Sequence, residues 1–311
     1  MRNNSLDNIN GVLITFMFFY HVVGFAGLSE DLYIITNIFS FFMPWFFFKS
    51  GMFFKEEKFI DIYHKSIKRL IYPFIYFSII GHFIYCLYLF FVVKDFNIIH
   101  YTLSPIKQLL MYGSIAGNLP LWFLLSLFAV RIIFFYVYKN KYLISLLVAI
   151  PYLVYIFKIN IPLYFVNVFS GLFFYSCGYF LKKHQYNNKF FLIAFGIYFL
   201  ALILCPSYID MRTNNLVWGN YYWYYIVALA GIITINGLFF NLTKKEIPVL
   251  NILGKNSMAI LCIHWLVLYC VKIIFPNLQG FSFLIVSALL VIIVMPIIIL
   301  WIRHTKLRNF I

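Results

Sequence analysis

The sequence predicts an all-α fold: a polytopic integral membrane helix bundle of about ten transmembrane helices, with both termini cytoplasmic. Three observations predict it. Hydrophobic residues make up 64% of the 311 residues, charged residues only 11%, and the mean hydropathy is +0.92. A soluble domain has about 25% charged residues. The apolar residues also gather in long runs, and basic residues mark alternate loops between those runs.

The apolar runs define the expected spans, since a transmembrane helix needs about 20 apolar residues. Ten stretches meet or approach this length: 9–27, 32–54, 70–93, 121–138, 142–157, 162–181, 190–206, 222–241, 257–275 and 282–302. The pieces between them are too short for a soluble domain. The longest outer piece, 94–120, contains prolines and glycines and is a candidate re-entrant segment. We therefore expect one membrane domain over residues 1–311.

Loop charges orient the chain, because cytoplasmic loops carry an excess of Lys and Arg. With the N-terminus inside, 17 of the 24 Lys and Arg residues fall on the inner side. Four fall on the outer side: Lys94, Lys107, Lys158 and Arg212. This bias predicts an even number of spans with both ends inside. It also accounts for the net charge of +15 without a nucleic-acid partner.

The cysteines and the first apolar stretch suggest neither a metal site nor a cleaved leader. The five cysteines lie within or at the ends of apolar runs and show no CxxC or Cys/His spacing, so we expect small buried side chains. The first stretch carries His21 and no small-residue cleavage site follows it. We expect a retained helix there.

The positions of the acidic residues argue against a transporter driven by protons or sodium. All nine Asp and Glu residues fall outside the predicted spans or at their edges. Transporters driven by protons or sodium commonly hold a carboxylate near the membrane midplane. This pattern weakens such a function and turns attention to the histidines within the spans.

His21 is the first of these histidines. It lies eleven residues beyond Asn10, about 16 Å along a helix, and therefore in the outer half of a hydrocarbon core about 30 Å thick. Imidazole titrates near neutral pH and can take a proton from a substrate hydroxyl. A single intramembrane histidine is also often a hydrogen-bonded packing residue, and its position leaves both interpretations open. His82 and His264 are expected to be buried polar residues bonded to neighbouring helices.

The outer loop at about 206–221 combines polar and aromatic side chains. It holds Asp210, Arg212 and Trp218, together with Asn214, Asn215 and the rings of residues 221–223. Amides, one acid, one base and stacking rings are typical of a sugar-binding surface. An interfacial aromatic belt would have a similar composition, so both interpretations stay open.

Five stretches, taken together, resemble the acyltransferase-3 family of bacterial transmembrane O-acyltransferases. They are residues 5–11 (SLDNING) running on to His21, 46–54 (FFFKSGMFF), the basic cluster from Lys65 to Pro73, 120–124 (PLWFL), and 253–257 (LGKNS) followed by His264-Trp265. Each string is common alone in membrane proteins. Their order and spacing over residues 5–265 carry the resemblance.

The resemblance implies a membrane O-acyltransferase. It would move an acyl group, most often acetyl, from cytoplasmic acyl-CoA to a hydroxyl of a cell-surface or lipid-linked polysaccharide, in the bacterial plasma membrane. It implies acetyl-CoA as co-substrate, with no bound cofactor or metal. His21 is then the expected catalytic residue, acting as a base or carrying the acyl group. The expected supporting or acceptor-binding residues are Ser50, Trp122, Asp210, Trp218, Asn256, Ser257 and His264.

The expected acyl-CoA-binding residues lie on the inner side: Asn10, Lys65, Lys68 and Arg69. The basic three could hold the phosphates of coenzyme A, or could act only as positive-inside anchors. The sequence departs from the family at Asn10, where members often have Arg or Lys; Asn10 keeps a hydrogen-bonding side chain without the charge. If His21 needs a carboxylate partner, the outer loops offer Glu30, Asp31, Asp95 and Asp210.

Two other functions remain open from the sequence. A transporter or flippase of a lipid-linked sugar would use the basic inner loops to bind a diphosphate carrier, with His21 structural. A non-catalytic partner in polysaccharide export is the second. Neither would transfer an acyl group, so transfer from acyl-CoA separates all three.

Overall fold

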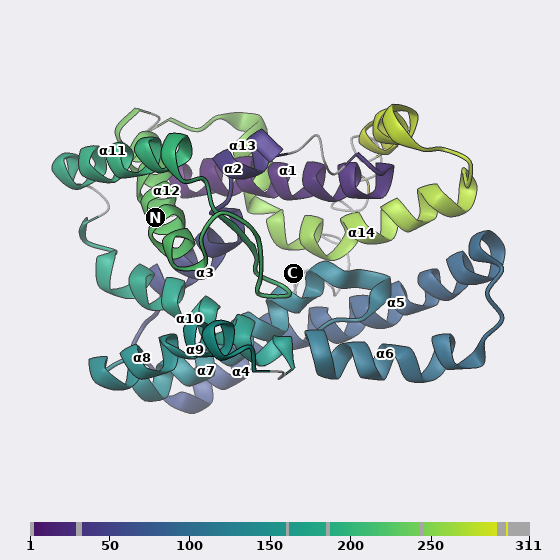
Figure 1. Cartoon of the computed structure of the whole chain (residues 1–311), viewed down its shortest axis with the longest axis horizontal. Coiled ribbons are helices and arrows are strands. Elements are labelled where there is room, and N and C mark those ends of the chain that lie inside the picture. The colour runs from purple at the N-terminus through teal and green to yellow at the C-terminus, as the bar shows by residue number, and fades with distance from the viewer. Residues whose placement is uncertain are drawn as a thin grey trace.

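The computed structural model describes residues 3–28, 33–159, 162–184, 187–242, 245–290 and 297. These residues form a helical bundle with one short hairpin (Figure 1). The helices are α1 Asn4–Ala26, α2 Tyr33–Ile38, α3 Phe42–Met52, α4 Phe59–Ser66, η2 Ile67–Ile71, α5 Tyr72–Tyr88, η3 Leu89–Val93, α6 Ile98–Tyr112, η4 Ala116–Leu121, α7 Trp122–Val137, α8 Lys141–Val148, α9 Ile150–Phe157, α10 Leu163–Leu181, α11 Asn188–Leu204, α12 Tyr221–Leu242, α13 Pro248–Lys255 and α14 Ser257–Ile274. The strands are β1 Tyr208–Asp210 and β2 Asn215–Trp218.

The described residues include six helical segments long and apolar enough to cross a membrane. They are Asn4–Ala26, Phe59–Val93, Ile98–Val137, Tyr164–Leu181, Tyr221–Asn241 and Ser257–Ile274. Three shorter apolar helices coincide with further predicted spans: Lys141–Phe157, Asn188–Leu204 and Gly280–Leu290. The polytopic helix bundle is thus confirmed, while ten spans and two cytoplasmic termini stay predictions. Much of the last predicted span, 282–302, lies outside the described residues.

The second predicted span, 32–54, is divided between two helices. α2 ends at Ile38 and α3 begins at Phe42. The rings of Trp45, Phe47 and Phe48 in α3 are fully buried. Trp45 donates from its indole nitrogen to Asn236 Oδ1 on α12, at 2.9 Å. α3 is therefore a core helix, and its aromatic side chains pack against neighbouring helices.

Helices pack closely where glycines remove the side chain. An added Cβ at Gly11 would lie 2.1 Å from the backbone oxygen of Leu250, and one at Gly254 would lie 1.8 Å from that of Asp7. α1 and α13 therefore touch backbone to backbone, side by side in the upper part of Figure 1. α14 contacts both α1 and α5, so the N-terminal helix and a helix near residue 270 are direct neighbours.

Replacing Gly254 with alanine should destabilise the bundle. The new methyl group overlaps the Asp7 carbonyl, so α1 and α13 must separate, and overpacking of this kind costs about 1–3 kcal/mol. We expect a lower thermal unfolding midpoint for the detergent-purified protein. Gly196→Ala is the matched control, because an added Cβ at this helical glycine meets nothing within 4 Å. Equal midpoints for the two variants would contradict the close contact.

The outer segment 94–120 is mostly helical and folds back onto the bundle. α6 ends at Gly113, whose φ of 69° places it in the left-handed region that glycine tolerates. η4 then packs against α5 and α14. The fully buried Asn118 donates to the carbonyl of Cys262 on α14, at 2.8 Å. The segment thereby closes one side of the space beneath the outer loops.

The outer loop 206–221 forms a hairpin that is hydrogen-bonded to α10 and α12. β1 and β2 are antiparallel, with Asp210 opposite Asn215. At the turn, Asn214 accepts a hydrogen bond from Ser170 on α10 and donates to Tyr221 on α12. Asn167 of α10 donates to the Arg212 carbonyl at 3.3 Å and accepts from Ser126 of α7. The hairpin is therefore held in place above the bundle.

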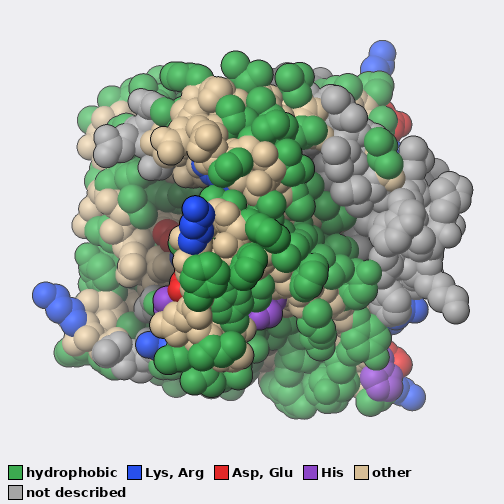
Figure 2. Space-filling model, turned by 90° about the vertical axis from the view of Figure 1, so that its right-hand side faces the viewer, with side chains coloured by type: hydrophobic (Ala, Val, Ile, Leu, Met, Phe, Trp, Pro, Cys, Tyr) green, Lys and Arg blue, Asp and Glu red, His purple; other side chains and the backbone are tan. Residues whose placement is uncertain are grey.

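The outer surface suits a lipid environment. Many large apolar side chains are exposed, including Ile79, Phe83, Leu192 and Leu204, each more than 60% accessible. Hydrophobic side chains cover most of the face in Figure 2, where Lys and Arg side chains project separately and form no continuous patch. The exposed apolar side chains would be shielded from water by lipid, in agreement with a membrane-embedded bundle.

Candidate functional site

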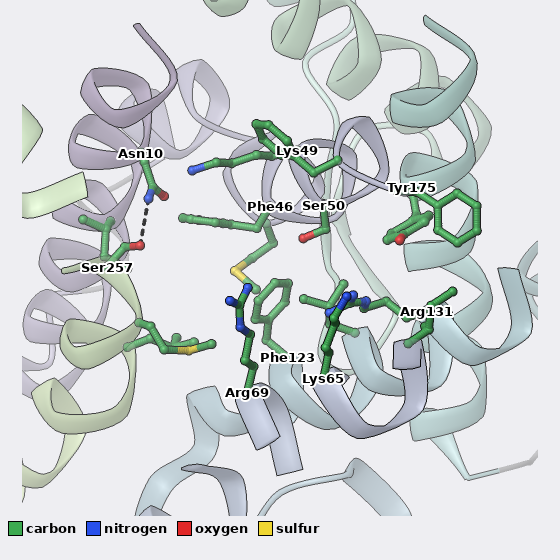
Figure 3. Close-up of a pocket in the computed structure, with 18 of the residues that line it drawn as sticks. Asn10, Phe46, Lys49, Ser50, Lys65, Arg69, Phe123, Arg131, Tyr175 and Ser257 are labelled. Carbon is green, nitrogen blue, oxygen red and sulfur yellow. Dashed lines mark hydrogen bonds between the residues drawn. The ribbon is translucent and has the colours of Figure 1, made fainter. Parts of the chain in front are cut away.

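A large cavity of about 520 Å³ opens on the side where the sequence predicts the cytoplasm. α1, α3, α7, α10 and α14 surround it, and the chain from Lys55 to Arg69 forms its mouth. Five of the residues expected from the sequence line it: Asn10, Ser50, Lys65, Arg69 and Ser257 (Figure 3). Lys68 is exposed beside the mouth, outside this lining.

Cations outnumber acids in this inner cavity. Its lining contains Glu57 and five basic residues: Lys49, Lys55, Lys65, Arg69 and Arg131. Lys65 reaches into the cavity from α4, Arg69 from η2 and Arg131 from α7 (Figure 3). Glu57 is hydrogen-bonded to Lys65, which lowers the pKa of the Glu57 carboxyl and keeps it ionised at neutral pH. The cavity can therefore hold an anion with several negative charges.

Asn10 faces the same cavity from α1. Its Nδ2 donates to the Gly254 carbonyl at 2.6 Å and to Ser257 Oγ at 2.7 Å. Its Oδ1 is buried without a hydrogen-bond partner. Lys49 extends from α3 toward Asn10 across the cavity (Figure 3). The Lys49 ammonium group thus points toward Asn10, the position where members of the family often have Arg or Lys.

A pair of histidines lies farther along α1. His21 Nδ1 is 2.9 Å from His264 Nε2, and the two rings are nearly parallel, at 14°. His264 is fully buried, and its Nδ1 is 2.8 Å from the Ile260 carbonyl. The edge of the Trp265 ring packs against His21, with the centroids 5.0 Å apart. The orienting partner of His21 is therefore an imidazole of α14.

The hydrogen bonds assign the tautomers of this pair. A carbonyl only accepts, so His264 Nδ1 carries a proton and donates to Ile260. In neutral His264 the other nitrogen, Nε2, must then accept from His21 Nδ1–H. His21 Nε2 is consequently unprotonated. This arrangement leaves a basic nitrogen on the ring that lines the cavity above.

A second cavity, of about 220 Å³, lies at His21 and beneath the hairpin. Its lining includes Tyr20, Trp122 and Trp265, and from the hairpin Asp210 and Arg212. The Asp210 carboxylate accepts from the Arg212 backbone at 3.0 Å and from the Thr213 hydroxyl at 2.8 Å, which fixes the turn. This middle cavity shares Met17, Met43 and Leu261 with the inner cavity. The two spaces therefore meet one helical turn below His21.

A third cavity, of about 780 Å³, continues outward from His21. Six of its ten lining residues are aromatic: Tyr20, Phe25, Tyr33, Tyr208, Trp218 and Trp265. Trp218 is held by a hydrogen bond from its indole nitrogen to Asn37 Oδ1, at 2.6 Å, and packs between Tyr33 and Tyr208. A ring held this way offers a fixed face for stacking.

The other described residues that the sequence singled out lie away from these cavities. Asn256 is the C-cap residue of α13, and its side chain donates to the Ile252 carbonyl at 2.6 Å. His82 Nε2 lies 2.9 Å from the Tyr101 carbonyl on α6, so it bonds to a neighbouring helix as expected, although it is only half-buried. Asp95 pairs with His100, which lowers the pKa of the Asp95 carboxyl. Glu30 and Asp31 lie outside the described residues.

These features define a class of protein: a membrane helix bundle with a histidine pair between an inner cationic cavity and an outer aromatic one. A family model described as an acyltransferase domain matches residues 3–302. The chain therefore belongs to the acyltransferase-3 family, as the sequence motifs predicted, and is a membrane acyltransferase by that membership. No curated protein and no solved structure matches it.

Proposed function

We propose that this acyltransferase transfers an acyl group, acetyl in particular, from cytoplasmic acyl-CoA to a hydroxyl of a cell-surface or lipid-linked glycan. One observation carries the proposal: His21, with a basic Nε2, lines both the middle and the outer cavity, and the middle cavity meets the inner one a helical turn below it. A donor entering from one side and an acceptor from the other would meet at this nitrogen.

The inner cavity suits the donor. The nucleotide end of coenzyme A carries several phosphate charges, and the five basic side chains of the lining offer matching cations. Lys65 and Arg69 lie at the mouth, with Lys68 beside it. From Asn10 to Met17 is seven residues, about 10 Å along α1. The thin pantetheine arm can cover this distance and bring the thioester toward His21.

His21 then acts as the general base. Its Nε2 takes the proton of the acceptor hydroxyl while the hydroxyl oxygen attacks the thioester carbonyl. The carbon–sulfur bond breaks, and the thiolate leaves with the proton from His21 as free coenzyme A. His264 stabilises the imidazolium by accepting from Nδ1–H. If His21 instead carried the acyl group, coenzyme A would be released in a burst before any acceptor is added.

The outer cavity suits a sugar acceptor. The faces of pyranose rings stack on aromatic side chains, and Trp218, Trp265 and Tyr33 present such faces. Among the described residues that line the outer cavity, none besides His21 has a side chain that can carry a charge near neutral pH. An uncharged sugar is therefore the favoured acceptor.

Replacing Trp218 with alanine should raise KM for the acceptor about tenfold and leave KM for acetyl-CoA unchanged. Loss of one stacking contact costs on the order of 1 kcal/mol, which is about fivefold, and loss of the bond to Asn37 adds to it. Trp218→Phe should restore most of the affinity. Trp223→Ala, outside the three linings, is the control. An unchanged acceptor KM in Trp218→Ala would remove this residue from the acceptor site.

Replacing Glu57 with glutamine should lower KM for acetyl-CoA about twofold to fivefold at low salt. The ionised carboxylate repels phosphate and occupies Lys65 at the cavity mouth. The gain should fade as salt is added, because the site is exposed. Glu246→Gln, which breaks the pair with Lys255 away from the cavity, is the control. A KM that rises would mean that Glu57 helps to bind the donor.

The direct test of function uses purified protein, acetyl-CoA labelled in the acetyl group, and a glycan acceptor. Labelled glycan ester together with free coenzyme A is the expected result. Movement of a lipid-linked sugar without acyl transfer would favour the flippase. Neither transfer nor movement would favour a non-catalytic export partner.

A further inference from the structure

We propose that Met17, Met43 and Leu261 form a neck that selects the length of the transferred acyl chain. This inference rests on the proposed function, because it assigns specificity to the same site. The three side chains are the residues common to the linings of the inner and middle cavities. They come from three different helices, α1, α3 and α14, and so encircle the passage between the two cavities.

The neck lies close to the reacting atoms. Met17 is four residues before His21 on α1, about 6 Å along the helix. Leu261 is three residues before His264 on α14, nearly one turn away. A thioester carbonyl near His21 Nε2 therefore has its sulfur at the neck. Its acyl chain must fit above the neck or fold back against these three side chains.

The space beyond the neck is small. The middle cavity measures about 220 Å³ and must also admit the acceptor hydroxyl, whereas the inner cavity measures about 520 Å³. All three neck side chains are less than 10% exposed, so they are held by surrounding protein. The two methionines are unbranched and can yield to a thin pantetheine arm, whereas Leu261 is branched and stiffer. The neck thus admits the arm and disfavours a long acyl chain.

The test compares acetyl-CoA with butyryl-CoA as donors. A pocket contact with one or two methylenes changes relative rates by about tenfold or more. In Leu261→Ala and Met43→Ala, we expect the ratio of kcat/KM for butyryl-CoA to that for acetyl-CoA to rise about tenfold over wild type. The narrowing variant Leu261→Phe should slow acetyl transfer while coenzyme A binding is kept.

The control is Leu268→Ala, a fully buried leucine two turns farther along α14 that lines none of the three cavities. Membrane levels of every variant are measured alongside the rates. An unchanged ratio in both widening variants, or an equal rise in Leu268→Ala, would overturn the neck while acetyl transfer by wild type persists. Absence of transfer from any acyl-CoA by wild type would overturn the proposed function itself.

Discussion

Replacing His21 with alanine abolishes acyl transfer while the protein still reaches the membrane. The substitution removes Nε2, the nitrogen that we propose receives the acceptor proton, and a general base of this kind contributes about 10²–10⁴-fold in rate. The side chain lines two cavities and is only partly buried, so its removal leaves the surrounding packing largely intact. Labelled acetyl transfer to glycan, normalised to membrane level, measures the loss.

His82→Ala is the matched control for that experiment. His82 is also an intramembrane histidine, but it bonds to the Tyr101 carbonyl and lines none of the three cavities. We expect it to retain transfer. Activity that survives in His21→Ala, or falls equally in both variants, would remove His21 from the chemistry.

Replacing His264 with leucine should lower kcat by about 10² or more, with little effect on KM for acetyl-CoA. Leucine cannot accept the Nδ1–H of His21, so the proton that fixes the tautomer and ring orientation loses its partner. His264 acts through His21, as a positioning residue. The size of the loss follows from the general-base contribution of a correctly held imidazole.

His264→Gln separates orientation from simple packing. Its side-chain oxygen can lie near the place of Nε2 and accept from His21, so we expect a clear recovery over leucine. The pH profile of kcat should also shift between the two variants, because the partner stabilises the protonated form of His21. Equal activity and equal pH profiles in leucine and glutamine variants would contradict a hydrogen-bonded role.

Hydropathy predicted the membrane bundle and most of its helices, and the reasons for its misses are physical. Residues 32–54 have the apolar length of a span, yet α3 is covered by protein and α2 is separate from it. An apolar run does not say whether lipid or protein will cover it. The hairpin of β1 and β2 was missed because its strands are only three and four residues long, and a bulge breaks their pairing register.

The sequence singled out individual residues of the candidate site but not the contacts between them. The motifs singled out His21, Lys65, Arg69 and Ser257, and all four line cavities. The bond between His21 and His264 joins residues 243 positions apart, and only the neighbourhood of α1 and α14 reveals it. The direction in which Lys49 and Arg131 point, into the inner cavity, likewise depends on the rotation of α3 and α7, which hydropathy does not give.

In the proposed function, one polypeptide joins a donor on one side of the membrane to an acceptor on the other. Sealed inside-out vesicles carrying the glycan acceptor in their lumen test it, with labelled acetyl-CoA added to the outer medium. We expect alkali-labile acetyl ester on the lumenal glycan in wild type and none in His21→Ala. Ester formed only when donor and acceptor share one compartment, or glycan labelled equally by His21→Ala, would contradict it.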